Sequence, residues 1–437
     1  MKLESLSLAN CRGFEQLDIN FESDVTLIAG VNGVGKSTVL RALVVLLSRA
    51  MPEFTPSRSV PLYFTDDDIY NDKAALNILA QIQIRDQSIY AAIQRLRSAE
   101  SKGDRFVTLQ TGGANTEPTD FAKSLKDRTL TGDLQAGSKL TRSTFAQLKN
   151  SSRHPLAVYF SPKRQLSSQP RTLPDDTTLS PSVAYWEALD DREVNLRYFM
   201  HWFRIQEKLG ISDEPRRLKI LNALICVVND LIPEFNNMRV QDQPRLGFLV
   251  DKCGKPFYLH QLSDGERGLL ALVFDLTRRL AIANPDSDDP IAEGVALVLI
   301  DEIELHLHPK WQRDVMIRLP KIFKSCQFVI TTHSPQVLGE VPAHCVRLLI
   351  PKDGRVVVET PAMSYGVDSN WILNVLMGAD EMDQDVSREL EDISRLIQAR
   401  ELKTAKAKIS FLRNNVGNTV ATQKLASLLE RIERLGR

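Results

Sequence analysis

The chain has 437 residues, enough for two or three domains that each bury a core of their own. Its 55 basic and 55 acidic residues cancel. This formal charge of zero excludes a surface that is basic throughout, although a balanced total can still contain a local basic patch for nucleic acid. The five cysteines are scattered and lack C-x-x-C spacing, which favours free thiols in a reducing compartment over a disulfide or zinc framework.

Three strands are predicted before the first glycine-rich segment, within residues 2–29. Residues 16–21 alternate apolar and polar side chains, which indicates a strand with one buried face. The amino terminus shows no signal peptide, and no apolar run in the chain reaches transmembrane length. We therefore expect a cytoplasmic protein that does not enter a membrane.

Residues 30–38 read Gly-Val-Asn-Gly-Val-Gly-Lys-Ser-Thr and fit G-x-x-x-x-G-K-[ST], the phosphate-binding loop. Its glycines let successive backbone N–H groups point at an anion, and the helix that follows adds partial positive charge. Lys36 is expected to reach the β- and γ-phosphates, and the Ser37 hydroxyl to bind Mg²⁺. The sequence therefore predicts a nucleoside triphosphate with Mg²⁺. The loop residues predicted to bind nucleotide are Gly30, Asn32, Gly33, Gly35, Lys36, Ser37 and Thr38.

The chain after this loop mixes strands, a polar stretch and helices. A strand pair is predicted at 75–84 and 89–96, and a buried strand at 156–160. Residues 98–153 are mostly polar, which predicts a partly mobile surface insertion. Residues 187–232 are predicted to form two helices.

Residues 295–302 form an apolar run that ends in Asp301 and Glu302, which predicts a buried parallel strand. Asp301 at the strand tip can hold the Mg²⁺ shell, and Glu302 can polarise the attacking water. Phosphoryl transfer depends mostly on positioning and charge stabilisation, so a base beside the metal ligand makes chemical sense. The alternative interpretation is an acid pair that merely ends a strand.

Another apolar strand, 328–332, leads into a polar turn that contains His333. A histidine at such a tip could hydrogen-bond the γ-phosphate, whereas a lone histidine more often has a structural role. Its position, one helix and one strand after the acid pair, favours function. The predicted catalytic residues are therefore Lys36, Glu302 and His333.

Residues 262–267, Leu-Ser-Asp-Gly-Glu-Arg, precede an apolar helix that runs to residue 280. Ser263, Gly265 and the helix N-terminus could form a second cradle for an anion. Asp264 and Glu266 would repel phosphate, so the backbone and Ser263 must do the binding. Read alone, the segment is a helix N-cap with acids in its first turn.

Together and in this order, the motifs resemble the ABC-type ATPases, which implies ATP as the nucleotide. The run at 262–266 is similar to that family's signature Leu-Ser-Gly-Gly-Glu, with Asp264 in place of the first glycine. In that family the signature of one subunit completes the ATP site of another. The resemblance thus implies a homo-oligomer, at least a head-to-tail dimer around two nucleotides. Residues 10–14, Asn-Cys-Arg-Gly-Phe, resemble the opening motif of the SMC-like branch and make Arg12 a candidate nucleotide contact.

The run at 301–312 is similar to prokaryotic AAA-type, OLD-like ATP-binding proteins of virulence and phage defence. Within that group the chain resembles the PtuA-like ATPases of Septu and retron–Septu systems. This resemblance implies an HNH-type nuclease partner, and in retron systems a reverse transcriptase with its DNA. It also places residues 304–308 in a D-loop that communicates across the dimer. Gln165 is the candidate for the family's Q-loop, although residues 161–164 depart from the usual pattern.

The resemblance implies an α/β fold: an SMC-like ABC-type ATPase head with a mixed or parallel sheet behind the phosphate loop, an antiparallel β lobe, a helical lobe and a C-terminal helical domain. The carboxy-terminal helices are expected either to form a small bundle or to offer a partner surface. The expected domains are an N-terminal lobe at 1–97, the insertion at 98–153, the helical lobe with linker strands at 154–261, the C-terminal ATPase lobe at 262–360 and the helical domain at 361–437.

Two other functions remain alternatives: an OLD-like ATP-dependent nuclease and an SMC-like DNA-repair ATPase. The nuclease would need a metal-binding acidic domain after His333, where the sole acidic spacing is Asp383-x-Asp385 in a helical setting. The repair ATPase would need long coiled-coil arms, which the sequence lacks, or a basic surface facing DNA. Direct contact with nucleic acid is therefore possible but not evident, and a regulated defence ATPase is favoured.

Overall fold

The computed structural model shows two compact units, Met1–Ser369 and Asn370–Arg437. Most of the predicted insertion at 98–153, and Asp383 of the acidic pair, lie outside the described residues. The structure describes residues 1–84, 87–97, 104–110, 145–149, 151, 153–167, 180–212, 215–243, 245–378, 384–417 and 420–435.

A six-stranded sheet forms the centre of the first unit, in the order β14-β13-β3-β12-β11-β7. Its strands are β3 (Val25–Gly30), β7 (Leu156–Phe160), β11 (Ala296–Ile300), β12 (Gln327–Thr332), β13 (Val346–Lys352) and β14 (Arg355–Glu359). All neighbours are parallel except β13 and β14. Every residue of β3, β11 and β12 is buried, as the continuous apolar runs in the sequence predict.

A five-stranded antiparallel sheet stands beside it, in the order β2-β1-β4-β5-β6. Its strands are β1 (Lys2–Cys11), β2 (Phe14–Asn20), β4 (Ala75–Ile84), β5 (Gln87–Leu96) and β6 (Arg105–Gln110). The three strands predicted before the loop and the later strand pair are confirmed. Strand β6 was not predicted, because its six residues lie within 98–153, which was assigned as a whole to a polar surface insertion.

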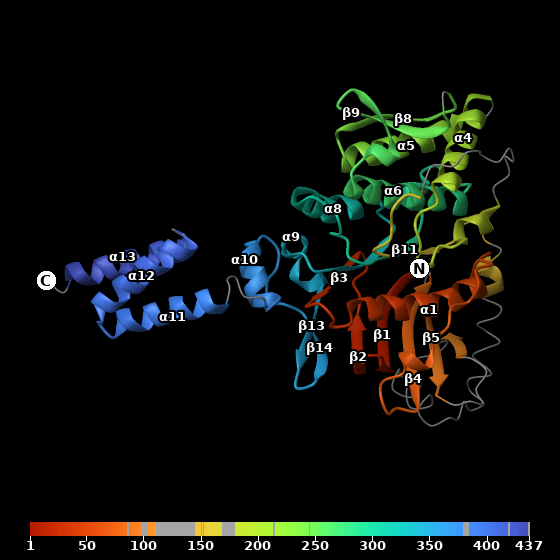
Figure 1. The fold of residues 1–437 in the computed structure, drawn as a ribbon. Coiled ribbons are helices and arrows are strands. Elements are labelled where there is room, and N and C mark those ends of the chain that lie inside the picture. Colours follow the sequence, from red (N-terminus) through yellow and green to blue (C-terminus); the bar gives the residue numbers. More distant parts are fainter. Residues whose placement is uncertain are drawn as a thin grey trace. The chain divides into compact units, whose positions relative to one another are not determined.

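Helix α1 (Lys36–Phe54) lies between the two sheets, with β5 on one side and β3, β7 and β12 on the other (Figure 1). Thirteen of its 19 residues are buried, so it is apolar around most of its circumference, as a helix covered on both sides must be. This packing fixes the first turn of α1, which carries Lys36 and Ser37.

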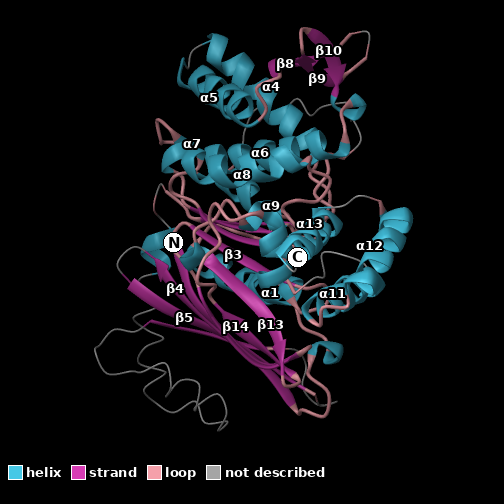
Figure 2. Ribbon diagram, turned by 90° about the vertical axis from the view of Figure 1, so that its left-hand side faces the viewer, coloured by secondary structure: helices cyan, strands magenta, loops and turns pink. Residues whose placement is uncertain are grey.

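A helical lobe covers β7 through α6 (Asp264–Ala283), and α4 (Leu196–Ser212) and α5 (Pro215–Leu231) pack against α6. The two helices predicted over 187–232 are thereby confirmed. Figure 2 shows this lobe and its three-stranded sheet apart from the long strands β4 and β5. The small sheet consists of β8 (Phe235–Gln241), β9 (Gly247–Lys252) and β10 (Lys255–Tyr258).

Aromatic rings form the core between α4, α6 and β9. Phe199 and Phe274 stack in parallel with ring centroids 4.0 Å apart, and Phe248 meets both rings edge-on. Helix α8 (Pro309–Ile322) lies between β11 and β12 in the sequence. Shorter helical segments of the first unit are η1 (Asp66–Asp68), η2 (Pro181–Tyr185), η3 (Leu259–Gln261), α7 (Pro290–Glu293), α9 (Pro335–Leu338) and η4 (Ala343–Cys345).

The second unit is a bundle of α11 (Gln384–Gln398), α12 (Leu402–Val416) and α13 (Val420–Leu435), as the helical spacing predicts. It is preceded by the short α10 (Ser369–Trp371) and the π-helical turn η5 (Ile372–Leu376). The bundle has a core of its own, formed by Ile393, Ile397, Ala405, Ile409, Leu412 and Leu429. Within the described part of the chain, no helix combines the length and the apolarity that crossing a membrane requires. The two units and their sheets confirm the predicted α/β fold class with a helical C-terminal part.

Candidate nucleotide-binding site

Four parallel strands bring the predicted motifs to one edge of the central sheet. The phosphate loop follows β3, Asp301 follows β11, His333 follows β12 and Gln165 comes shortly after β7. The register sets Ile300 beside Ile330, and Thr332 beside Ala29. Because the carboxyl ends of parallel strands share an edge, residues far apart in sequence become neighbours there.

Gly35 shapes the loop where it enters α1. Its φ of 106° lies in the left-handed region, and a Cβ at this position would stand 2.3 Å from Cζ of Phe14. Only glycine fits both the backbone angle and this close approach. Phe14, at the start of β2 and 1% exposed, therefore forms the support beneath the loop, a role that the sequence did not reveal. Asn32 and Gly33 lie on the exposed side of the same loop.

Lys36 is held at the centre of the site by three acceptors. Its ammonium group donates to the carbonyl oxygens of Gly30 at 2.9 Å and Val31 at 3.0 Å, and lies 3.1 Å from Nδ1 of His333. Burial lowers the pKa of Lys36 to about 8, although Glu304, Asp301 and Glu302 act in the opposite direction. The side chain is thus a desolvated cation beside a group of carboxylates, as phosphate binding requires.

The tautomer of His333 follows from this contact. Burial lowers the pKa of His333, and the neighbouring Lys36 lowers it further, so the ring is neutral near pH 7. A charged ammonium donates to Nδ1, and the ring proton must then sit on Nε2. His333 therefore presents an N–H donor on its other side, which is what a phosphate oxygen would need.

Ser37 and Asp301 supply the oxygen ligands predicted for Mg²⁺. Oγ of Ser37 donates to Oδ1 of Asp301 at 3.2 Å, and the hydroxyl of Thr331 donates to the same carboxylate oxygen. Asp301 is 3% exposed, so its carboxylate is held rigidly at the strand tip. Mg²⁺ in nucleotide sites usually takes one or two protein oxygens together with phosphates and waters, and this pair fits that requirement.

The turn after β11 is held in an unusual backbone conformation. Glu302 has a φ of 49°, and its N–H donates to Oγ1 of Thr331 at 2.8 Å. Two residues later, the Glu304 carboxylate accepts hydrogen bonds from the Thr332 hydroxyl at 2.8 Å and from the His333 N–H at 2.5 Å. Glu304 therefore joins the turn after β11, residues 301–304 (the acid turn), to the turn that contains His333. The sequence placed it in the D-loop but did not indicate this contact.

Ser263 caps helix α6. Its hydroxyl donates to the Glu266 carboxylate at 2.8 Å and accepts from the Glu266 N–H at 3.4 Å. Gly265 packs so closely that a Cβ would stand 2.3 Å from the His306 carbonyl oxygen. The structure thus accounts for both residues within one chain, as cap and as packing contact. Their predicted contact with a neighbour's nucleotide stays a prediction.

Arg12 and Gln165 make contacts away from the loop. Nε of Arg12 donates to Oδ1 of Asp68 at 2.7 Å, and the Arg12 N–H donates to the Asp68 carbonyl at 2.8 Å. The Gln165 side-chain oxygen accepts from Arg267, in the first turn of α6, at 3.5 Å. The roles of Arg12 and Gln165 in binding the nucleotide remain predictions. The contact with Arg267 places Gln165 beside the first turn of α6.

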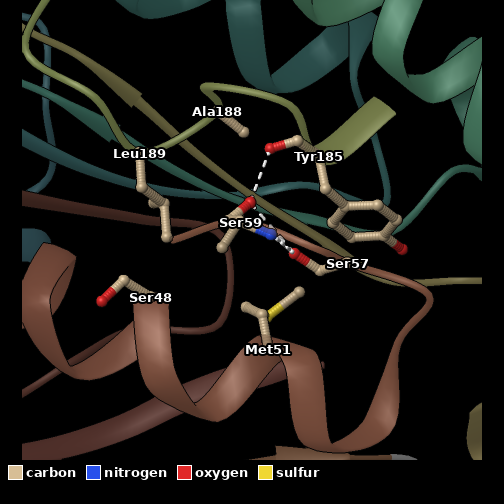
Figure 3. A pocket seen from close by; sticks show the side chains of 8 residues that line it. Ser48, Met51, Ser57, Ser59, Tyr185, Ala188 and Leu189 are labelled. Atoms are coloured by element: carbon tan, nitrogen blue, oxygen red, sulfur yellow. Dashed lines mark hydrogen bonds between the residues drawn. The ribbon is translucent and has the colours of Figure 1, made fainter. Parts of the chain in front are cut away.

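A small cavity lies behind α1, away from the loop (Figure 3). Ser59 bridges it by donating to the Tyr185 carbonyl at 3.0 Å and meeting the Ser57 hydroxyl at 3.0 Å. Its volume of about 10 Å³ is close to the minimum for one water molecule. This cavity is therefore no candidate for a nucleotide.

The strand–loop–helix, the acid-tipped strand and the histidine-tipped strand define a P-loop nucleotide-binding protein. A profile of the family described as "AAA domain, putative AbiEii toxin, Type IV TA system" matches residues 25–339. The match spans more than half of the 437 residues and includes the loop, the acid pair and His333. The chain belongs to this family, and is thus an ATP-binding protein of the AAA class.

Comparison with individual proteins confirms the resemblance to retron and Septu ATPases. The Retron Ec83 probable ATPase of Escherichia coli is 28% identical over 427 residues, which covers 86% of this chain and 76% of that protein. The Septu protein PtuA of Bacillus thuringiensis is 22% identical over 395 residues, covering 87% of this chain and 85% of that protein. Among solved structures, the SMC head bound to the C-winged helix domain of ScpA matches with a TM-score of 0.48 and 15% identity, over 82% of this chain and 98% of that chain.

Proposed function

We propose that this chain is a Mg²⁺-dependent ATPase that closes as a head-to-tail dimer and controls a partner nuclease in anti-phage defence. The observation that carries the ATPase part is the meeting of Lys36, Ser37, Asp301 and His333 at one sheet edge, with Glu302 on the adjoining turn. These residues come from segments up to 297 positions apart, and each has the chemistry that its place in the reaction needs.

In the proposed reaction, water attacks the γ-phosphorus of ATP and the bond to the β–γ bridging oxygen breaks, which gives ADP and phosphate. Glu302 accepts the proton of the attacking water. Lys36 places its charge at the β- and γ-phosphates, and Nε2–H of His333 donates to a γ-phosphate oxygen. Ser37 and Asp301 would hold Mg²⁺, which would supply further charge neutralisation at the phosphates.

The dimer is proposed because the segment 262–266 resembles a signature that acts on a neighbour's nucleotide. The test mixes Ser263→Arg with Lys36→Ala. A dimer of either variant alone has two defective ATP sites. In a head-to-tail dimer of one Ser263→Arg and one Lys36→Ala subunit, both substitutions fall in the same ATP site and the other site is wild type. We expect ATP hydrolysis to recover on mixing.

Ser263→Ala is the control for this experiment, because it removes the helix cap without adding bulk. Loss of the cap alone costs about 1 kcal/mol of stability, so a Ser263→Arg protein that melts together with Ser263→Ala is folded, and its further loss of hydrolysis comes from the added side chain. If mixed dimers form without regaining activity, either the two sites work only as a pair or Ser263 serves its own subunit. Normal hydrolysis by Ser263→Arg alone would rule out the signature role.

The nuclease partner is proposed because the relatives carry retron and Septu names. We propose an HNH-type nuclease and, in a retron setting, a reverse transcriptase with its DNA. The test expresses this chain with the genes beside it and challenges the cells with phage. We expect protection that Lys36→Ala abolishes, and purification of this chain should bring the nuclease with it. Protection that persists in Lys36→Ala cells would separate defence from nucleotide binding.

A further inference from the structure

One buried arginine grips the turn that carries Glu302. Arg164, on the segment after β7, donates through Nη1 to the Asp301 carbonyl at 2.6 Å. Its Nη2 donates to the carbonyls of Glu302 at 2.7 Å and Ile303 at 3.1 Å. A guanidinium is planar and presents several donors in fixed directions, so it can hold three successive carbonyls in one geometry as no other side chain can.

Arg164 is almost wholly removed from water, with 5% of its surface exposed. Burying a cation is costly unless nearby groups compensate for the lost hydration. Burial lowers the pKa of Arg164 to about 10, whereas Glu304, Asp301 and Glu302 raise it. Three carboxylates and four carbonyls offset the desolvation of Arg164; the fourth carbonyl is that of Ser161, at 3.3 Å from Nη1.

The turn needs such support because of its backbone angle. A non-glycine residue at the φ of Glu302, 49°, is disfavoured and persists only where surrounding contacts hold it. Thr331 fixes the N–H of Glu302 from one side, and Arg164 fixes its carbonyl from the other. Between them they set where the Cα–Cβ bond of Glu302 points.

Arg164 and the next residue, Gln165, also contact the first turns of helix α6. The carbonyl oxygen of Arg164 would stand 3.6 Å from a Cβ on Gly268, and the next residue, Gln165, contacts Arg267. A displacement of the start of α6 would therefore displace Arg164, and Arg164 would in turn shift the carbonyls of Asp301 and Glu302.

We propose that Arg164 is a positioning residue for hydrolysis, which fixes the backbone of Glu302 so that its carboxylate meets the attacking water. It acts through Glu302 and does not touch ATP. This inference rests on the proposed role of Glu302 as the base.

The test compares Arg164→Met and Arg164→Lys with wild type by ATP affinity and by turnover at saturating Mg²⁺-ATP. Misplacing a catalytic group slightly can cost about 100-fold in rate. We expect turnover to fall about 10- to 100-fold in Arg164→Met, with the ATP dissociation constant changed less than about threefold. Turnover by Arg164→Lys should lie between that of Arg164→Met and that of wild type, because an ammonium keeps the charge but cannot span three carbonyls. If the Met variant does not fold, the Lys variant carries the same test.

A double-mutant cycle with Glu302→Gln separates positioning from general damage. If Arg164 acts through Glu302, adding Arg164→Met to Glu302→Gln should lower the residual turnover less than about twofold. A full additional loss of 10-fold or more would overturn the inference. If Glu302→Gln abolishes turnover while Arg164→Met retains it, only the inference fails. If Glu302→Gln itself turns over at the wild-type rate, the inference and the assigned base fail together.

Arg347→Met is the matched control. Arg347 is also buried and also clamps carbonyls, those of Asn20 at 2.8 Å, His344 at 2.5 Å and Val346 at 3.2 Å. Its contacts lie at the start of β13 and the end of β2, and none of them is to residues 301–303. We expect its loss to lower the melting temperature while turnover per folded molecule stays within about twofold of wild type. An equal fall in turnover for both variants would make the Arg164 effect a matter of stability and contradict positioning.

Discussion

Oγ of Ser37 lies 3.2 Å from Oδ1 of Asp301, across a gap of 264 positions in the sequence. Ser37 lies in the first turn of helix α1, and Asp301 directly follows strand β11. Their contact is the point where the phosphate loop and the acid strand become one site. It exists because β3 and β11 both lie beside β12 in the central sheet, on opposite sides of it.

Lys36→Ala should abolish measurable ATP binding. The lysine is the buried cation beside the loop carbonyls of Gly30 and Val31, and a charged hydrogen bond to phosphate is worth about 1.5–3 kcal/mol, or roughly 10- to 150-fold in affinity. Calorimetric titration with ATP measures the loss. Lys352→Ala, on an exposed strand end, is the control and should bind as wild type does. Unchanged ATP affinity in a folded Lys36→Ala protein would show that residues 30–38 do not bind the phosphates of ATP.

Gly265→Ala should destabilise the protein, because the new methyl group would stand 2.3 Å from the backbone oxygen of His306. Overpacking of this kind typically costs about 1–3 kcal/mol. Gly13→Ala is the control, since nothing lies within 4 Å of a Cβ at Gly13. Thermal melts of the two variants compare them directly. Equal melting temperatures would mean that Gly265 does not pack against the His306 carbonyl.

Asp275→Asn should lower stability strongly, by about 3–5 kcal/mol. Asp275 accepts from Arg278 at 2.8 Å and Arg279 at 2.7 Å inside the helical lobe, and the substitution leaves two buried cations poorly paired. Burial raises the pKa of Asp275, but the two arginines lower it more, so the net pKa lies below its usual range. Because the folded pKa is depressed, the aspartate stabilises the fold above about pH 4 and loses this effect as pH falls further.

Denaturant titrations of wild type and Asp275→Asn at about pH 7 and about pH 2.5 measure this contribution, because the loss falls below the ordinary aspartate pKa. The gap between the two proteins should narrow at the lower pH. Asp264→Asn is the control, because Asp264 pairs with Arg267 at the surface, where such pairs contribute at most about 1 kcal/mol. A gap that widens toward acid would contradict the buried pair.

Alkylation of the native protein should modify Cys226 and Cys253 first, because both are exposed. Burial raises the pKa of Cys11 and Cys326 to about 12 and that of Cys345 to about 11, which keeps these thiols protonated and unreactive. Mass spectrometry after a short reaction with iodoacetamide identifies the modified residues. Early modification of Cys326 would show that the start of β12, next to this residue, opens to solvent.

Much of the fold follows from local patterns. Continuous apolar runs predict β3, β11 and β12 because a strand buried on both faces has no polar side. The phosphate loop is predicted by its glycine spacing, and the chemical residues by their place at strand ends. Parallel strands put such ends together, so the positions of Lys36, Asp301 and His333 in the sequence are enough to assign them to one site.

The supporting contacts could not be predicted, because they depend on tertiary packing with no local signal. Phe14 reaches under Gly35 from another sheet, and Glu304 ties two turns together through bonds to residues 28 and 29 positions away. Arg164 lies where the sequence departs from the expected Q-loop pattern. An arginine in the segment that follows a buried strand is the one available hint, and it does not say which carbonyls the side chain will meet.

The proposed reaction depends on Glu302, which activates the attacking water at a site where Lys36 and Asp301 hold Mg²⁺-ATP. The direct measurement is single-turnover hydrolysis by Glu302→Gln, alongside its ATP affinity. Glutamine keeps the shape of the side chain but cannot accept the proton, so the account predicts wild-type affinity and a rate reduced by about 100-fold or more. Hydrolysis at the wild-type rate by a folded Glu302→Gln protein would contradict it.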